Sequence, residues 1–144
     1  MVLHIATIPF GTPRWDESVH LRDLVLRQPL GLQFDAAALS QEYEQVALGA
    51  YDAAATLVGV LLLQDYGERC KMRQVAVHPD WQRRGVGQAL VAASEDWARR
   101  QGYRVMELHA RTVAVPFYER LGYATYGPEF EEVGIPHLAM RSVL

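Results

Sequence analysis

The chain has 144 residues, half of them hydrophobic and 22% charged, which is an ordinary globular composition. This length predicts a single domain over residues 1–144 with a core of its own. The net charge of −3 argues against broad nucleic-acid binding, which needs a basic face, but it leaves room for a local site for one phosphorylated ligand.

The sequence also disfavours several other classes of protein. A single cysteine, Cys70, allows no intrachain disulfide, which fits a reducing compartment. The longest apolar run, LVGVLLL at residues 57–63, has the length of a strand and falls short of the ~18 residues of a membrane span. The N-terminal segment lacks the pattern of a signal peptide, so we expect a cytoplasmic protein without a membrane partner. The five histidines show no metal-ligand spacing, and we expect no metal site.

Hydrophobic periodicity and turn residues predict the element order β-α-α-β-β-β-α-β-α-β-β. The expected elements are a strand at 3–10, helices at 16–32 and 35–44, a hairpin at 45–66, a strand at 70–79, a helix from 85 to 101, a strand at 103–110, a short helix at 112–122, and strands at 123–127 and 135–143. This order predicts an α/β fold in which helices flank both faces of a mixed central β-sheet.

The ends of the predicted helices follow from their capping residues. Asp16 or Ser18 would cap the first helix, and Pro29 with Gly31 would end it. Gly102 would end the long helix in a left-handed conformation.

One apolar face of that long helix is formed by Val86, Leu90, Ala93 and Trp97, at positions i, i+4, i+7 and i+11. The turn before it, within HPDWQRRGVGQAL at residues 78–90, carries two arginines and two glycines. The first N–H groups of a helix have no internal partners and favour an anion, and glycines let these amides approach a phosphate closely. On its own, this pattern fits a phosphate site and a solvated turn equally well.

Two familiar phosphate motifs do not fit this turn. A P-loop needs Lys followed by Ser or Thr after its second glycine, and neither pair occurs here. A dinucleotide fingerprint needs a third small residue, where this chain has Leu90, and an acidic residue at the end of a second strand.

A second segment distinguishes the alternatives. QRRGVG at residues 82–87, followed by RTVAVPFYERLGY at 111–123, resembles the GNAT superfamily of acetyl-CoA-dependent N-acetyltransferases. The first segment is similar to its pyrophosphate motif, [QR]-x-x-G-x-[GA], and the second to its A-x-x-F-Y-E-x-L-G-F helix beside the pantetheine. LRDLVLRQPLGL and FEEVGIPHLAM are further similar to a bacterial subgroup of unassigned substrate.

The resemblance implies the GNAT fold over nearly the whole chain, with acetyl-CoA as co-substrate and no metal. It implies backbone donors to the pantetheine and acetyl group from the strand around Val75 and Val77. The implied cofactor-binding residues are Gln74, Val75, Ala76, Val77, Gln82, Arg83, Arg84, Gly85, Val86, Gly87, Gln88, Thr112, Ala114, Phe117, Tyr118 and Arg120. Many family members have Asn at the start of the second helix. This chain reads Ala110, Arg111 and Thr112 there, and Thr112 could cap the helix in its place.

Acetyl transfer to an amine needs a base for the amine and an acid for the thiolate. The resemblance implies Tyr118 as the acid, whose ordinary pKa of ~10 lies near the ~8.5 of a thiol. Phe117 and Leu121 would then form the core face of that helix, with Tyr118 turned toward the cleft. The candidate bases are His137, which we favour because the subgroup segment includes it, Glu132, His109 and Glu107, and a water chain is the alternative.

The function that the resemblance implies is transfer of the acetyl group of acetyl-CoA to a primary amine of a small molecule or peptide, by direct attack in a ternary complex. Dimers are common in this superfamily, so a homodimer is one expected state. The carboxylates of Glu42, Glu44, Glu131 and Glu132 suggest a cationic acceptor, although a solvated acidic surface explains them equally well. The alternatives are an acetyl-CoA-binding sensor or regulatory module without turnover, and an α/β partner-binding domain without a cofactor.

Overall fold

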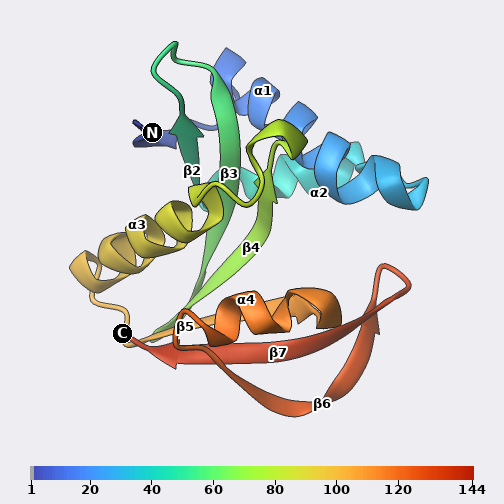
Figure 1. Cartoon of the computed structure of the whole chain (residues 1–144), viewed down its shortest axis with the longest axis vertical. Helices are drawn as coiled ribbons and strands as arrows, with labels where there is room; N and C mark the ends of the chain where they lie inside the picture. The colour runs from blue at the N-terminus through green and yellow to red at the C-terminus, as the bar shows by residue number, and fades with distance from the viewer. Residues whose placement is uncertain (1) are drawn as a thin grey trace.

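The computed structural model of the chain describes residues 2–144. Its sheet has seven strands in the order β1-β2-β3-β4-β5-β7-β6 (Figure 1). Their bounds are β1 His4–Ile8, β2 Val46–Tyr51, β3 Leu57–Tyr66, β4 Arg69–Val77, β5 Val105–Arg111, β6 Ala124–Glu132 and β7 Ile135–Val143. The helices are α1 Pro13–Arg22, α2 Ala36–Ser40, α3 Val86–Arg100 and α4 Val115–Glu119.

Helices cover both faces of this sheet, as the sequence predicts. On one face, Leu21 of α1 packs with Val60, Leu62 and Ala76 of the central strands. On the other face, α3 and α4 pack over a larger cluster that includes Leu61 and Met72 (Figure 1). Because side chains alternate along a strand, β3 and β4 supply both clusters. The prediction of a mixed α/β sheet flanked on both faces is confirmed.

The sheet divides between β4 and β5, its one parallel neighbouring pair. These strands pair only from Arg69 opposite Val105 to Met72 opposite Leu108. Gln74 then adopts a positive φ of 56°, and the register of β4 with β3 shifts at the same place. This irregularity bends β4 away from β5. The two halves of the sheet therefore diverge, as Figure 1 shows, and leave a gap at the carboxyl ends of both strands.

The first predicted helix differs from the structure in its cap and its regularity. Thr12 caps it, because its side chain accepts a hydrogen bond from the backbone N–H of Trp15, and Pro13 occupies the first turn. The prediction of Asp16 or Ser18 as the cap was wrong. After Arg22 the helix widens into a π-helical turn, Asp23–Arg27, and then tightens into a 3₁₀ turn that ends at Gly31.

The short helix that the sequence predicts over residues 112–122 is also shorter in the structure. Residues 112–114 form a 3₁₀ turn, and only Val115–Glu119 are α-helical. No side-chain cap occupies the start of either part, so the prediction that Thr112 caps this helix was wrong. Gly102 and Gly122 take the left-handed conformation with φ of 91° and 95°, the first as predicted for the end of α3.

No helix among residues 2–144 is both long enough and apolar enough to cross a membrane. Within the same residues there is no group of three or more His, Cys, Asp or Glu side chains placed to hold a metal ion. Cys70 is buried, and burial raises the pKa of its thiol to about 12.

Candidate active site

The turn that leads into α3 exposes backbone amides without side-chain partners. Gly85 is the N-cap residue with φ of 85°, and it supplies no side chain to cap the first turn. A Cβ at Gly85 would meet no atom within 4 Å, so the space beside this backbone is open. The helix has 15 residues and its dipole favours an anion at this end. This local geometry fits the pyrophosphate motif at residues 82–87, and we call this turn the diphosphate cradle.

The side chains of the turn are held to one another rather than across that opening. Gln82 donates from Nε2 to the Val77 carbonyl, 3.1 Å away. The Arg84 guanidinium stacks over Trp81, 4.2 Å from the ring centre. Arg83 has a positive φ of 61° and an exposed side chain. Both arginines therefore border the cradle without filling it.

Gly87 joins the two predicted motifs by direct packing. A Cβ built there would lie 3.3 Å from Cζ of Phe117 and 3.8 Å from Cγ2 of Val77. A Cβ at that distance would be a tight contact, so glycine lets the Phe117 ring pack closely against α3. The first motif and the second are thus fixed against each other at the gap between β4 and β5.

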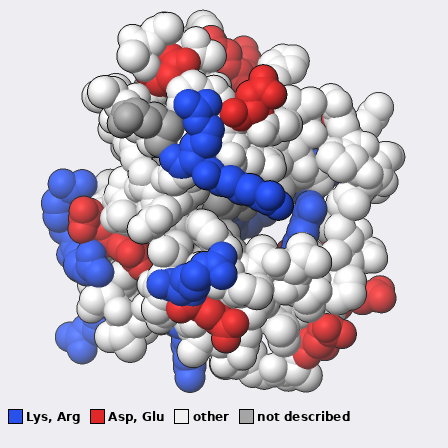
Figure 2. All heavy atoms as spheres, in the orientation of Figure 1, with Lys and Arg blue, Asp and Glu red and all other residues white. Residues whose placement is uncertain are grey.

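A cavity of about 580 Å³ passes through that gap. Figure 2 shows this face of the molecule hollowed near its centre, with Lys and Arg side chains bordering the hollow. The residues that line the cavity are Val25, Leu26, Arg27, Lys71, Met72, Arg73, Gln74, Val75, Gln82, Leu108, His109, Ala110, Arg111, Ala114, Tyr118, Glu132, Val133 and His137. The predicted catalytic residues Tyr118, His137, Glu132 and His109 are all among them.

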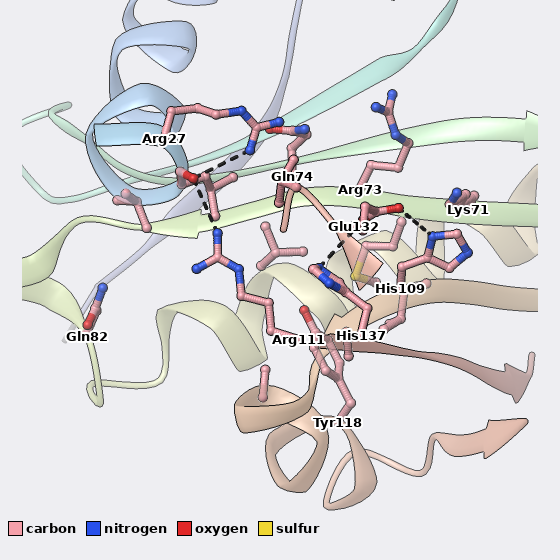
Figure 3. A pocket seen from close by; sticks show the side chains of 18 residues that line it. Arg27, Lys71, Arg73, Gln74, Gln82, His109, Arg111, Tyr118, Glu132 and His137 are labelled. Atoms are coloured by element: carbon pink, nitrogen blue, oxygen red, sulfur yellow. Dashed lines mark hydrogen bonds and ion pairs between the residues drawn. The ribbon is translucent and has the colours of Figure 1, made fainter. Parts of the chain in front are cut away.

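Tyr118 is the buried residue of α4, with 7% of its surface exposed, while Phe117 and Leu121 are only partly buried. The sequence predicted Phe117 and Leu121 on the core face of this helix and Tyr118 turned toward the cleft. This separation was too simple, because Tyr118 both packs in the core and reaches the cavity (Figure 3). Burial raises the pKa of Tyr118 to about 12. The phenol thus stays protonated at neutral pH, but it is a weaker acid than an ordinary tyrosine.

Glu132 lies between two histidines at the end of β6 (Figure 3). Its Oε1 is 3.0 Å from Nδ1 of His109, and its Oε2 is 3.6 Å from Nε2 of His137. The Phe130 ring lies against both imidazoles. Burial by itself would raise the pKa of Glu132. The hydrogen bond from His109 and the charges of His109, His137 and Lys71 outweigh burial and lower it.

The tautomer of His137 follows from its other contact. Nδ1 donates to the carbonyl oxygen of Ile135 at 2.8 Å, since a carbonyl can only accept. In neutral His137 the proton is therefore on Nδ1, and the lone pair of Nε2 faces the cavity beside Glu132. A donor such as an amine N–H, placed between Nε2 and the carboxylate, would satisfy both acceptors.

Glu107 does not belong to this site. Its carboxylate pairs with Arg69 at 3.0 Å, accepts a hydrogen bond from Tyr126 at 3.1 Å, and lies outside the cavity lining. It links β5 to Arg69 of β4 and to Tyr126 of β6, and its contacts are structural. Its place among the candidate bases was wrong.

The predicted cofactor residues divide into two groups. Gln74, Val75, Gln82, Ala114 and Tyr118 line the cavity. The remainder do not line it: Ala76, Val77, Arg83, Arg84, Gly85, Val86, Gly87, Gln88, Thr112, Phe117 and Arg120. The side chains of Ala76 and Val86 are in the core, so these two could contribute only backbone atoms. Oε1 of Gln74 is buried and has no hydrogen-bond donor among the described residues.

Sequence reasoning missed a group of basic side chains, which we call the basic wall: Arg27, Lys71, Arg73 and Arg111. Lys71 and Arg73 are two residues apart on β4, so they share one face of the strand. That alternation was a readable signal. Arg27 joins them only through the π-helical turn after α1, which no periodicity predicts.

The acidic residues that suggested a cationic acceptor do not gather at the cavity. Glu42 is buried in a bidentate ion pair with Arg22, with both N–O distances 2.9 Å. Glu44 and Glu131 lie outside the lining. Only Glu132 of that set faces the cavity, so the structure does not support the suggestion.

Comparison with known proteins adds a family match. The family model described as "Acetyltransferase (GNAT) domain" matches residues 21–144. A Bacillus subtilis protein named "Putative acetyltransferase" is 35% identical over 83 residues, which is 58% of this chain and 56% of that protein. The chain spans about half the length of the curated relatives it matches first.

Solved structures share the fold over nearly the whole chain. A "putative N-acetyltransferase" from Lactobacillus plantarum superimposes with a TM-score of 0.86 at 22% identity, covering 100% of this chain and 99% of that one. An aminoglycoside 6'-N-acetyltransferase complexed with coenzyme A gives 0.80 at 18% identity, covering 97% and 96%. At these identities the likeness shows the fold alone.

Proposed function

Because the chain belongs to the acetyltransferase (GNAT) domain family, we propose that it transfers the acetyl group of acetyl-CoA to a primary amine of a small molecule or peptide. The amine would attack the thioester directly while both substrates are bound. The new N–C bond forms as the C–S bond breaks, the amine passes a proton to the base, and the sulfur leaves as a thiolate that takes up a proton from solvent. The observation that carries this proposal is the cavity that reaches from Gln82, at the start of the turn before α3, to the Glu132–His137 pair.

The residues present fit acetyl-CoA at the α3 turn. The open backbone at Gly85, the uncapped first turn of α3 and the two flanking arginines suit a diphosphate. Acetyl-CoA supplies the activated acetyl group. Beyond Met72, strand β4 has no partner on β5, although it still pairs with β3 on its other side. Backbone N–H groups near Val75 are the proposed donors to the acetyl carbonyl.

The proposed proton transfers use residues on opposite walls of the cavity. His137 would accept the amine proton at Nε2, because its Nδ1 is held by the Ile135 carbonyl. Glu132 would accept a hydrogen bond from the amine and stabilise the imidazolium that follows. Tyr118 would donate a hydrogen bond to the departing thiolate from α4, where it stays protonated.

Isothermal titration with acetyl-CoA, followed by a thiol-release assay on a panel of amines, tests this function. Saturable binding with thiol release that depends on an amine would support it. Binding without release from any amine would instead favour a sensor module. Absence of acetyl-CoA binding would overturn the proposal altogether.

A further inference from the structure

The basic wall gives the cavity more positive charge than the one carboxylate on its described lining can offset. Four basic side chains line the cavity, and Glu132 is the one carboxylate among the described lining residues. In the range 2–144, no member of the wall lies within ion-pair distance of a carboxylate, whereas Arg14, Arg22, Arg69 and Arg99 all have such partners. Glu132 is itself occupied by His109 and His137.

Two members of the wall are held against each other. The guanidinium groups of Arg111 and Arg27 point at the same oxygen, the carbonyl of Leu26, at 3.3 Å and 3.5 Å (Figure 3). Burial lowers the pKa of Arg27, and the charges of Arg111 and Arg22 lower it further. A fold that keeps two like charges together in a half-buried place has room there for an anion.

The other two members lie on strand β4, and each contacts a neutral side chain. Nη1 of Arg73 donates to the side-chain oxygen of Gln45 at 2.8 Å. The Lys71 ammonium lies 5.6 Å from the centre of the Tyr66 ring, and burial lowers the pKa of this lysine as well. Neither side chain forms an ion pair among the described residues, so both are available to an anion in the cavity.

The diphosphate of acetyl-CoA does not account for this charge. Lys71 and Arg73 alternate with Met72, whose side chain is in the cluster beneath α3. The basic wall therefore lies on the opposite face of β4 from α3 and nearest the π-helical turn, whereas the proposed cradle is the turn that opens α3. An anion bound by the wall would belong to the second substrate.

We propose that the acceptor amine carries an anionic group, a carboxylate or a phosphate, and that the basic wall binds this group. This inference rests on the proposed function for the amine, and it adds the chemical class of the acceptor. The wall would hold the anion while the amine lies between His137 and Glu132. The same positive field would disfavour an ammonium ion and so help to keep the attacking amine neutral.

Amines of matched length test the acceptor class. The set is 4-aminobutyrate, 4-amino-1-butanol and 1,4-diaminobutane, together with glycine, β-alanine and O-phosphoethanolamine to vary the length and the anion. Acetyl-CoA binding is measured first by titration, so that failure of the proposed function is seen separately. Binding of each amine to the CoA-saturated protein and thiol release from acetyl-CoA are then compared within each matched group.

We expect anionic amines to bind at least tenfold more tightly than their neutral analogues, and the diamine to bind most weakly. The charge-removing variants Arg27→Gln and Arg73→Gln should weaken binding of the anionic amine about tenfold while leaving the neutral analogue within twofold. Higher salt should weaken the anionic amine in the same selective way. The matched control is Arg100→Gln, which removes an exposed arginine at the far end of α3.

The opposite results would overturn the inference. If acetyl-CoA binds but neutral amines or the diamine bind as tightly as the anionic ones, the acceptor class is wrong although the function can stand. Equal losses for charged and neutral amines in Arg27→Gln and Arg73→Gln would also contradict it, because they would mean a general change of cavity shape. Two variants on separate elements, each checked by its thermal midpoint, guard against one failing to fold.

Discussion

Nε2 of His137 lies 3.6 Å from Oε2 of Glu132, while Nδ1 of the same ring donates to the Ile135 carbonyl. The imidazole is therefore fixed in orientation, with one nitrogen free for a ligand in the cavity. This fixed orientation underlies the proposed role of His137 as the base on the acceptor side of the site. It depends on the tight turn between β6 and β7. Val133 and Gly134 both adopt positive φ there, which returns the chain so that Phe130 pairs with His137.

Replacing this imidazole tests the proposed base. His137→Gln should lower turnover by about 10²-fold or more, since general-base contributions are of that order, and leave acetyl-CoA affinity within twofold. Steady-state kinetics and titration on the same preparation measure both. The control is His20→Gln, an exposed histidine of α1 outside the cavity. Full turnover in His137→Gln would contradict this role and leave Glu132, His109 or a water chain as the base.

The loss of stability at acid pH tests the charge state of Glu132. Its pKa in the folded protein is lower than in the unfolded chain, so the unfolded chain binds the proton more readily. The stability from this carboxylate is fully present above the ordinary carboxyl pKa, and it is lost as the pH falls through the lower folded value. Thermal midpoints from pH 7 down to about pH 3 should therefore fall less steeply in Glu132→Gln than in the parent. Parallel curves would mean that the histidines do not stabilise the carboxylate.

Tyr118→Phe tests the proposed donor to the thiolate. Removing one hydroxyl should reduce turnover by about tenfold to 10³-fold, while the affinity for acetyl-CoA changes little, because the ring still packs in the core. Tyr103→Phe is the matched control, since its hydroxyl binds Asp65 outside the cavity. Equal turnover in the two variants would remove Tyr118 from this role.

The buried ion pair between Arg22 and Glu42 holds the segment that carries the basic wall's Arg27. Both N–O contacts are 2.9 Å, and the Arg22 side chain has no exposed surface. Glu42→Ala leaves that guanidinium without its anion and should lower the free energy of unfolding by about 3–5 kcal/mol. Glu17→Ala, which breaks an exposed pair with Arg14, should cost no more than about 1 kcal/mol. Denaturant titration compares them, and similar losses would contradict the structural role.

The sequence predicted the order of the elements well because apolar periodicity and glycine stops are local signals. The face of α3 that carries Val86 and Leu90 could be read from spacing alone, and both side chains are buried. The bulge at Gln74 could not be read, because a non-glycine residue with positive φ there depends on packing from both sides of the sheet. That bulge opens the cavity.

The candidate site was predicted in part for the same reason. Tyr118 and His137 were named from short segments similar to a known family, and both line the cavity. The meeting of Arg27 with Arg111 at Leu26 joins residues 84 positions apart through a π-helical turn, so no spacing rule could predict it. Glu107 was misjudged because strand alternation gives the face of a residue but not its ion-pair partner.

The cradle at the start of α3 is the central claim, and the dissociation constant of acetyl-CoA for two glycine variants tests it most directly. Gly85 and Gly102 have φ of 85° and 91°, and a Cβ at either would meet no atom within 4 Å. Gly85→Glu and Gly102→Glu therefore add the same charge and a similar backbone strain at opposite ends of α3. We expect Gly85→Glu to abolish measurable acetyl-CoA binding, while Gly102→Glu binds like the parent. An unchanged dissociation constant in folded Gly85→Glu would place the diphosphate elsewhere and contradict the account.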